Sequence, residues 1–417
     1  MSKSPPLDPT RTGMGRDHIP ELDGFRGMGA LAVLWTHLPD AAFGETMAYI
    51  RHKYIPGEFA LDLFLVMSGF LITRILISER ERGVPLRYFL LRRMLRIFPV
   101  YFITIFALWP RLSSQEIVTC LTYTSNYGFM ALENQGPLEQ TWSLAIEEHF
   151  YLLWPPLIVF LGLRSARRVL IFGVFPLALL TLCFAYSNTT FFDRYLWGGW
   201  DTNPQAMREF VFRSSTIRFL SLGLGALLAF HEKRIRTSKK LSLALIAAGL
   251  FVGWAFTFGG VKALGLAPYL QSMPSVAPDY FNRMTNGLQV LSLPGFSLAF
   301  VVSAITWTGT WWPHVVLFRF HPFRWIGKIS YGIYIFHNGI FKTPGVLGIN
   351  RYEPSPWHVA VAIGVTILLA MVSYSLLEKP LLEFGKRFRH KKPLKAGETM
   401  PATEETAVVG AEKPNPS

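Results

Sequence analysis

Long apolar runs separated by short polar segments dominate the hydropathy pattern of this 417-residue chain. A helix needs about 20 predominantly apolar residues to cross a hydrocarbon core of about 30 Å. The runs that approach this length are 22–38, 57–78, 88–109, 142–162, 167–186, 211–230, 242–259, 288–306, 329–345 and 357–377. A further run at 115–131 is less apolar. The pattern predicts an all-α, polytopic integral membrane protein.

The distribution of Lys and Arg indicates how many runs cross the membrane. Basic residues gather in five segments, 74–96, 164–168, 231–240, 319–328 and 386–393. If 115–131 does not cross, all five lie on one side together with both termini. If it crosses, the charge pattern inverts from residue 142 onward. Because cytoplasmic loops carry the excess of basic residues, we expect about ten transmembrane helices, cytoplasmic termini, and a re-entrant or interfacial segment near 115–131.

Composition supports this class. The chain is 51% hydrophobic and 16% charged, whereas a soluble domain carries about 25% charged residues. The net charge of +14 would suit nucleic acid, but the basic residues lie between apolar runs, so we expect the lipid bilayer and no nucleic acid as partner. Cys120 and Cys183 are the only cysteines; they provide neither a disulfide framework nor a cysteine metal site, and no metal is expected.

The domain organisation follows from the same pattern. Residues 1–20 are polar and proline-rich without an apolar signal-peptide core, and 386–417 turn basic and then polar. We expect both to be disordered cytoplasmic tails. Residues 21–385 then form one transmembrane domain in the plasma (inner) membrane.

Arg26 and His37 bracket an apolar stretch and lie eleven positions apart. On a helix this is roughly 16 Å along the axis and about three turns, so both side chains project from one face. A cation and an imidazole on one stripe of a membrane helix are costly unless they face a polar cavity. We therefore take the pair as a candidate site. The alternative is that Arg26 flanks the membrane and His37 lies at its interface.

Asp62 lies inside the apolar run 57–78, followed by Ser68. A carboxylate in lipid needs a partner, and Arg26 or His37 is the expected one. By binding one imidazole nitrogen of His37, Asp62 would leave the other nitrogen free as a base. The alternative is a purely structural ion pair between helices.

Glu147 and Glu148 are adjacent in the run that begins at Trp142. Neighbouring side chains on a helix face different directions, so only one can point into a cavity. Glu147 and Tyr151 share a face at i, i+4. This spacing favours Glu147 as the inward carboxylate.

Arg92, Arg93 and Arg96 lie on one flank of the helix that enters the membrane near Pro99. Arg93 and Arg96, three residues apart, share a face and could bind a phosphate through several N–H groups. A cytoplasmic donor with several phosphates would fit there. The alternative is that these arginines only set the membrane topology.

Tyr331, Tyr334 and His337 are spaced three apart in another span and form a polar stripe. A single histidine in a span is usually a packing residue, but hydroxyl neighbours at helical spacing favour a stripe that lines a cavity. We expect this stripe and Trp142 to contact the acceptor substrate, and Ser68 to contact the donor.

Six stretches, in this order along residues 20–385, resemble the acyltransferase-3 family of membrane enzymes that O-acylate carbohydrates. They are LDGFRGMGALAVLWTH, FALDLFLVMSGFLITR, RRMLRIFP, TWSLAIEEHFYLLWP, ISYGIYIFH and LEKPL. The resemblance implies that Arg26 and His37 match the family's essential pair. It also implies that Arg93 and Arg96 match its Arg-x-x-Arg motif, which is tied to an acyl-CoA donor.

From the residues and the resemblance together, we expect acyl-CoA, by default acetyl-CoA, to bind from the cytoplasm and to acylate a hydroxyl of a carbohydrate or glycoconjugate. His37 would act as general base or take the acyl group itself, Asp62 or Glu147 would orient its ring, and Arg26 would stabilise negative charge. Two alternatives are a proton-coupled transporter of a sugar or anion and a non-catalytic scaffold.

Overall fold

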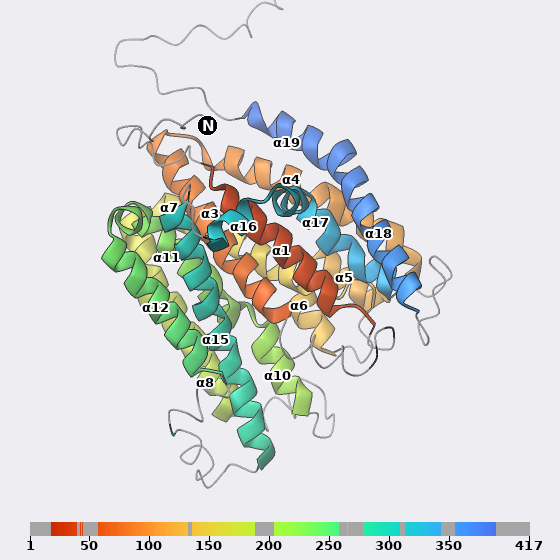
Figure 1. Cartoon of the computed structure of the whole chain (residues 1–417), viewed down its shortest axis with the longest axis horizontal. Coiled ribbons are helices and arrows are strands. Elements are labelled where there is room, and N and C mark those ends of the chain that lie inside the picture. The colour runs from red at the N-terminus through yellow and green to blue at the C-terminus, as the bar shows by residue number, and fades with distance from the viewer. Residues whose placement is uncertain are drawn as a thin grey trace, which may run out of the picture.

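The computed structural model describes residues 18–39, 57–131, 136–187, 204–257, 278–308, 313–342 and 355–388, with the single positions 42, 44 and 265. The described residues form helices and no strand (Figure 1). The α-helices are α1 (Pro20–Thr36), α3 (Gly57–Glu81), α4 (Leu86–Leu108), α5 (Ser114–Leu121), α6 (Ser125–Gly128), α7 (Thr141–Val169), α8 (Phe175–Ser187), α10 (Pro204–Arg213), α11 (Ser215–Thr237), α12 (Lys239–Ala255), α15 (Pro278–Trp307), α16 (Pro313–Arg319), α17 (His321–Phe341), α18 (Pro356–Ser373) and α19 (Lys379–Lys386). The predicted all-α class is confirmed.

Four described helical stretches are long and apolar enough to cross a membrane: Gly57–Glu81, Thr141–Ala185, Glu209–Thr237 and Pro356–Lys386. A shorter apolar helix covers Leu291–Trp307. α1 and α12 have 17 residues each, while α4 begins with arginines and α17 carries the polar stripe. A polytopic membrane protein therefore agrees with the structure, and the count of ten crossings stays a prediction.

The segment 115–131 is built from short helices rather than one long one. α5 has 8 residues and α6 has 4, and at ~1.5 Å per residue neither approaches the ~30 Å of a hydrocarbon core. Between them Tyr123 has φ 54°, a left-handed conformation that ends the first helix. The segment does not cross as a helix, and its expected re-entrant or interfacial placement remains a prediction.

The two adjacent runs predicted at 142–162 and 167–186 follow each other as helical segments separated by a kink. Gly162, at φ 78°, interrupts α7, and a π-helical turn at Leu170–Val174 connects α7 to α8. The kink frees carbonyls that would otherwise accept from amides four residues later. Arg80 of α3 donates to two of them, those of Ile158 and Val159, each at 2.9 Å.

Two close helix crossings hold the centre of the fold. A Cβ on Gly27 of α1 would lie 1.9 Å from the carbonyl oxygen of Phe323 in α17. One on Gly69 of α3 would lie 1.9 Å from that of Leu222 in α11. Glycine is required at both points because any side chain would push the backbones apart. The first crossing places α1 beside α17 and the second places α3 beside α11; α1 also packs against α3 (Figure 1). α4 packs against α17, and α7 packs against α3.

The expected tails lie largely outside the described residues. Only 18–20 of the first tail and 386–388 of the second are described. The predicted disorder of 1–20 and 386–417 is therefore not tested.

Candidate functional site

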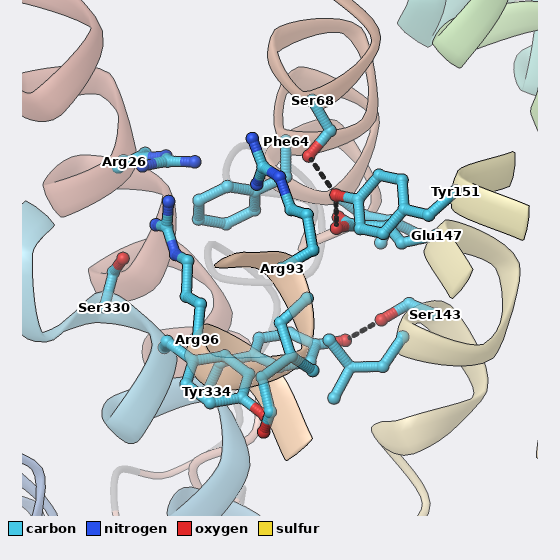
Figure 2. Close-up of a pocket in the computed structure, with 14 residues that line it drawn as sticks. Arg26, Phe64, Ser68, Arg93, Arg96, Ser143, Glu147, Tyr151, Ser330 and Tyr334 are labelled. Carbon is cyan, nitrogen blue, oxygen red and sulfur yellow. Dashed lines mark hydrogen bonds between the residues drawn. The ribbon is translucent and has the colours of Figure 1, made fainter. Parts of the chain in front are cut away.

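A cavity opens among α1, α3, α4, α7 and α17, with about 700 Å³ of empty space counting its open side. Arg26 of α1 and Arg93 and Arg96 of α4 point into it (Figure 2). The other lining residues are Leu61, Phe64, Ser68, Ile97, Ser143, Leu144, Glu147, Tyr151, Ser330, Tyr331 and Tyr334. We call it the arginine cavity.

The three guanidinium groups form no direct ion pair within the described chain. Arg93 lies over the rings of Phe89 and Tyr151, at 5.6 and 5.7 Å from their centroids. Neither it nor Arg26 nor Arg96 forms a hydrogen bond or ion pair with a described residue. Buried charges are normally paired, and guanidinium groups bind carboxylates and phosphates through several N–H donors. The arrangement is suited to a ligand with more than one negative charge.

Glu147 is the carboxylate of the cavity lining, and the prediction that it points inward is confirmed. The Tyr151 hydroxyl donates to it at 2.6 Å and lies 3.2 Å from the hydroxyl of Ser68 (Figure 2). The predicted i, i+4 partnership of Glu147 and Tyr151 is thus confirmed. Ser68 also lines the cavity, and its expected contact with the donor stays a prediction.

Arg92 does not join Arg93 and Arg96. It forms an ion pair with Glu79 of α3 and donates to the carbonyl of Phe388 at 3.2 Å. One residue along a helix rotates the side chain by about 100°, which turns Arg92 away from the face shared by Arg93 and Arg96. Its expected contact with the donor phosphates therefore lacks support from the structure.

Asp62 binds neither Arg26 nor His37, so the expected partnership is wrong. Its carboxylate accepts from Arg218 of α11 at 2.7 Å and from the hydroxyl of Ser221. The side chains of Asp62 and Arg218 are both 0% exposed. The close crossing of α3 and α11 brings these groups together, and it leaves Asp62 as a structural partner rather than the group that orients an imidazole.

His37 caps the C-terminal end of α1 and is exposed. It lies outside the arginine cavity, whereas Arg26 on the same helix lines it. Its Nδ1 is 2.8 Å from the carbonyl oxygen of Val33. A carbonyl can only accept, so Nδ1 carries the hydrogen and the neutral ring has its lone pair on Nε2. A main-chain carbonyl thus orients the ring in the way that was expected of Asp62.

The stripe on α17 runs from the arginine cavity to His37. Tyr331 and Tyr334 line the cavity; the Tyr331 hydroxyl donates to the Ile97 carbonyl at 2.8 Å. One turn further, the His337 ring lies 5.8 Å from that of Tyr334 and 4.8 Å from that of His37, centroid to centroid. The stripe is therefore continuous, although the two tyrosines lie at its arginine-lined end.

Trp142 is not brought to the cavity. Its ring is 7% exposed, packs against Phe212 at 5.0 Å and lies under the guanidinium of Arg213 at 5.4 Å. It stabilises the contact of α7 with α10, and its expected role at the acceptor lacks support from the structure.

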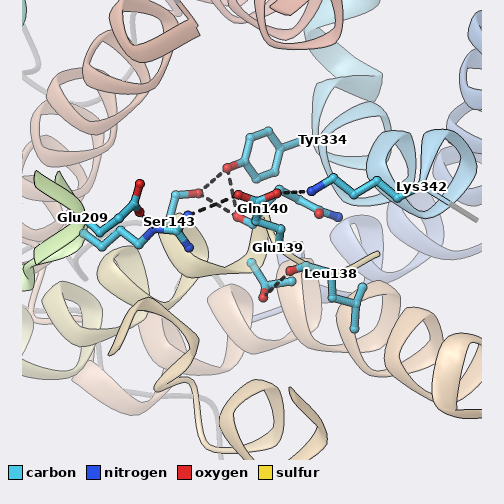
Figure 3. Close-up of polar contacts among 9 residues, drawn as sticks. Leu138, Glu139, Gln140, Ser143, Glu209, Tyr334 and Lys342 are labelled. Carbon is cyan, nitrogen blue, oxygen red and sulfur yellow. Dashed lines mark hydrogen bonds and ion pairs between the residues drawn. The ribbon is translucent and has the colours of Figure 1, made fainter. Parts of the chain in front are cut away.

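Sequence reasoning missed Glu139, which precedes α7. Its carboxylate forms ion pairs with Lys342 and, at 3.1 Å, with Arg213, which also binds Glu209 (Figure 3). Burial alone would raise the pKa of Glu139, but the charges of Lys342 and Arg213 outweigh it and hold this pKa below its ordinary value. The positive side chains lie 74 and 203 positions away in sequence, so no local spacing could reveal the cluster.

Hydrogen bonds join α7 to α17 between the arginine cavity and His37. Tyr334 donates to the Gln140 carbonyl at 3.0 Å and contacts the Ser143 hydroxyl (Figure 3). The Gln140 amide donates to the Ile335 carbonyl at 2.7 Å. They fasten the start of α7 to the middle of α17. Over the part of the chain that the structure describes, no three His, Cys, Asp or Glu side chains are grouped to hold a metal.

Comparisons with known proteins agree in one class. A family model described as an acyltransferase domain matches residues 19–375. The chain is 27% identical over 401 residues to the peptidoglycan O-acetyltransferase OatA of Listeria monocytogenes, covering 90% of this chain and 57% of that protein. It is 28% identical to the putative peptidoglycan O-acetyltransferase YrhL of Bacillus subtilis, over 89% and 56% of the two chains.

A third relative, the O-acetyltransferase OatA of Staphylococcus aureus, is 27% identical over 91% of this chain and 60% of its own length. The chain therefore spans somewhat more than half of the curated relatives it matches. No solved structure matches it.

Proposed function

The chain belongs to the acyltransferase-3 family, and from this premise we propose that it is a membrane O-acyltransferase. It moves an acetyl group from acetyl-CoA to a hydroxyl of an envelope carbohydrate. The observation that carries the proposal is the arginine cavity. Its three cations form no direct ion pair or hydrogen bond with a described residue, and one polar stripe of α17 connects it to His37.

Acyl-CoA is the donor that this geometry fits. Its phosphates supply the negative charge that Arg26, Arg93 and Arg96 lack, through charge-assisted hydrogen bonds. Its long uncharged arm can then extend along the stripe toward His37. Arg26 and His37 lie roughly 16 Å apart along α1, so one end of the donor is held by charge while the thioester reaches the imidazole. Ser68 and the Glu147–Tyr151 pair line the charged end.

His37 supplies the base. Its Nε2 lone pair takes the proton of the acceptor hydroxyl while the oxygen forms a bond to the thioester carbonyl carbon and the carbon–sulfur bond breaks. The proton then passes to the leaving thiolate of CoA, which balances the reaction. In a two-step relay the same lone pair first takes the acyl group and then gives it to the acceptor. Glu147 accepts a hydrogen bond from Tyr151 in the arginine cavity. This position supports a role near the donor rather than the orientation of the His37 ring.

The acceptor is a carbohydrate of the cell envelope, and peptidoglycan is the leading candidate because the matched relatives bear that substrate in their names. The acceptor would approach the end of the polar stripe at His37, beyond His337, and Tyr331 and Tyr334 lie nearer the donor. The topology that suits this transfer has about ten crossings, both termini in the cytoplasm and the arginine cavity facing the cytoplasm, from which acyl-CoA comes.

The test is an acetyl-transfer assay with purified full-length protein, labelled acetyl-CoA and peptidoglycan fragments. His37→Ala should lower transfer by about 10²- to 10⁴-fold, the usual contribution of a general base, without changing expression. His231→Ala is a matched control, because His231 of α11 makes the same contact with the carbonyl four residues before it, at 2.9 Å, away from the cavity lining. Full activity of His37→Ala contradicts the proposal, as does labelled solute that crosses liposomes unchanged, which indicates a carrier.

A further inference from the structure

Three neighbouring side chains on the path from the arginine cavity to His37 are buried without hydrogen-bond partners. Within the described chain no partner lies on Oε1 of Gln140, on Nε2 of His337, or on either polar atom of the Asn338 amide. Gln140 is 2% exposed, and His337 and Asn338 are 0% exposed. Nearly all buried polar groups in native proteins are hydrogen-bonded, so three exceptions in one place require an explanation.

These groups lie together because of the contacts already described. The Gln140 amide docks on the Ile335 carbonyl of α17 at 2.7 Å, which places its oxygen beside the turn that carries His337 and Asn338. Tyr334, at the edge of the arginine cavity, is one turn below, and the His37 ring lies against His337. A ligand that reaches from the cavity to His37 along α17 would therefore pass beside Gln140 and His337, and Asn338 is the next residue of α17 after His337.

The hydrogen-bonding character of each atom is defined by its neighbours. His337 donates from Nδ1 to the Tyr334 carbonyl at 2.7 Å, so the neutral ring offers only an acceptor at Nε2. The Gln140 amide nitrogen is used by Ile335, so its oxygen is a second acceptor. Asn338 offers both a donor and an acceptor. To satisfy these atoms a ligand must bring three N–H or O–H donors and one acceptor such as a carbonyl. All four atoms belong to neutral groups, so an uncharged ligand suits them.

We propose that Gln140, His337 and Asn338 bind the pantetheine arm of the donor. Pantetheine is an uncharged chain with two secondary amides and a hydroxyl, so it supplies N–H donors to Gln140 and His337 and complements the Asn338 amide. The inference rests on the proposed function, since it needs acyl-CoA as donor. It assigns the recognition of CoA to two separate parts: the arginines bind its phosphates, and these three side chains bind its amides.

The test separates the two parts with two fragments of the donor. S-Acetylpantetheine keeps the arm and the thioester but lacks the adenosine and all phosphates. Adenosine 3′,5′-bisphosphate keeps charged phosphates but lacks the arm. Each is measured as a competitive inhibitor of acetyl-CoA on the full-length protein. Asn338→Leu and His337→Phe should each weaken S-acetylpantetheine by roughly 3- to 10-fold, the usual effect of one hydrogen bond, and leave the bisphosphate unchanged. Arg93→Gln should do the reverse.

A second measurement distinguishes ligand binding from a structural role. Without ligand, Asn338→Leu removes unpartnered polar atoms from a buried site, so its melting temperature should equal or exceed that of the wild type. A lower melting temperature, or unchanged inhibition by S-acetylpantetheine in both variants, overturns the inference and indicates that water or protein groups satisfy these atoms. If the wild type binds neither acetyl-CoA nor either fragment, the proposed function itself fails; if it binds acetyl-CoA and the variants behave as wild type, only the assignment of the arm fails.

Discussion

The protein buries arginines in two contrasting ways. Arg218 of α11 is 0% exposed and binds Asp62, with Ser221 completing the coordination of the carboxylate and the Phe212 carbonyl accepting from Arg218 at 2.7 Å. Arg26, Arg93 and Arg96, in contrast, meet at the arginine cavity with no ion pair to a described residue. Both sets lie among helices expected to cross the membrane, where charge is costly.

This difference indicates that Arg218 has a structural role, whereas the arginines of the cavity are available to bind a ligand. A buried ion pair holds two helices in one arrangement, and losing one partner leaves an uncompensated buried charge. Cations that face an open cavity without partners instead lower the cost of binding an anion there. Substituting members of the two sets should therefore produce opposite losses, of stability in one case and of donor affinity in the other.

The largest effect is expected from Arg218→Met. It leaves the Asp62 carboxylate buried and unpaired, which typically destabilises a protein by about 3 to 5 kcal/mol. The measurement is the yield and melting temperature of the purified protein in detergent. A melting temperature equal to that of the wild type would show that the pair does not hold α3 against α11.

A compensated variant sharpens this prediction. Replacing the pair by apolar side chains, with Asp62→Leu, Arg218→Met and Ser221→Ala together, should recover most of the stability, because apolar replacements of buried ion pairs are often neutral. Since Asp62 is a structural partner, the recovered protein should also retain acetyl transfer. A stable but inactive triple variant would return Asp62 to the chemistry.

The second effect concerns the cavity arginines. Arg93→Gln and Arg96→Gln should each raise the KM for acetyl-CoA by about 10- to 100-fold, the equivalent of one charge-assisted hydrogen bond of about 1.5 to 3 kcal/mol, with the melting temperature unchanged. Arg92→Gln is the matched control on the same helix. Its ion pair with Glu79 is structural, so it should lower the melting temperature and leave this KM unchanged. Equal KM effects for Arg92 and Arg93 would contradict the assignment.

The sequence predicted correctly those features that depend on spacing within a single helix. Periodicity placed Arg93 and Arg96 on one face, and the i, i+4 spacing chose Glu147 over Glu148, as the structure confirms. The apolar runs likewise located the helices, because burial in lipid demands a period and a length that a single segment displays.

What could not be predicted depends on which helices are neighbours. Asp62 and Arg218 are 156 positions apart, and no local pattern indicates that α3 crosses α11 rather than presenting Asp62 to α1. The kink between two adjacent predicted spans lies at Gly162, and Arg80 from another helix binds a carbonyl beside it. Nor does spacing show that Arg26 lines the cavity while His37 lies beyond it, because the boundary is formed by α7 and α17.

The smallest effect is expected at Glu139, which shares features with both sets of charges. It is ion-paired, yet its side chain is 21% exposed and lies beside the proposed path to His37. Its folded-state pKa is depressed below that of the unfolded chain, after the opposing effect of burial, by Lys342 and Arg213. A depressed carboxyl pKa adds stability that is fully present above the unfolded value of about 4.3 and is lost as the pH falls through the folded value. Glu139→Gln should therefore melt lower than the wild type at pH 7, by the equivalent of about 1 kcal/mol, and the difference should shrink as the pH is lowered below about 4. A difference in melting temperature that stays constant from pH 7 to pH 3 would mean that the cluster stabilises α7 against α17 by packing and hydrogen bonds alone, and that its charges contribute nothing.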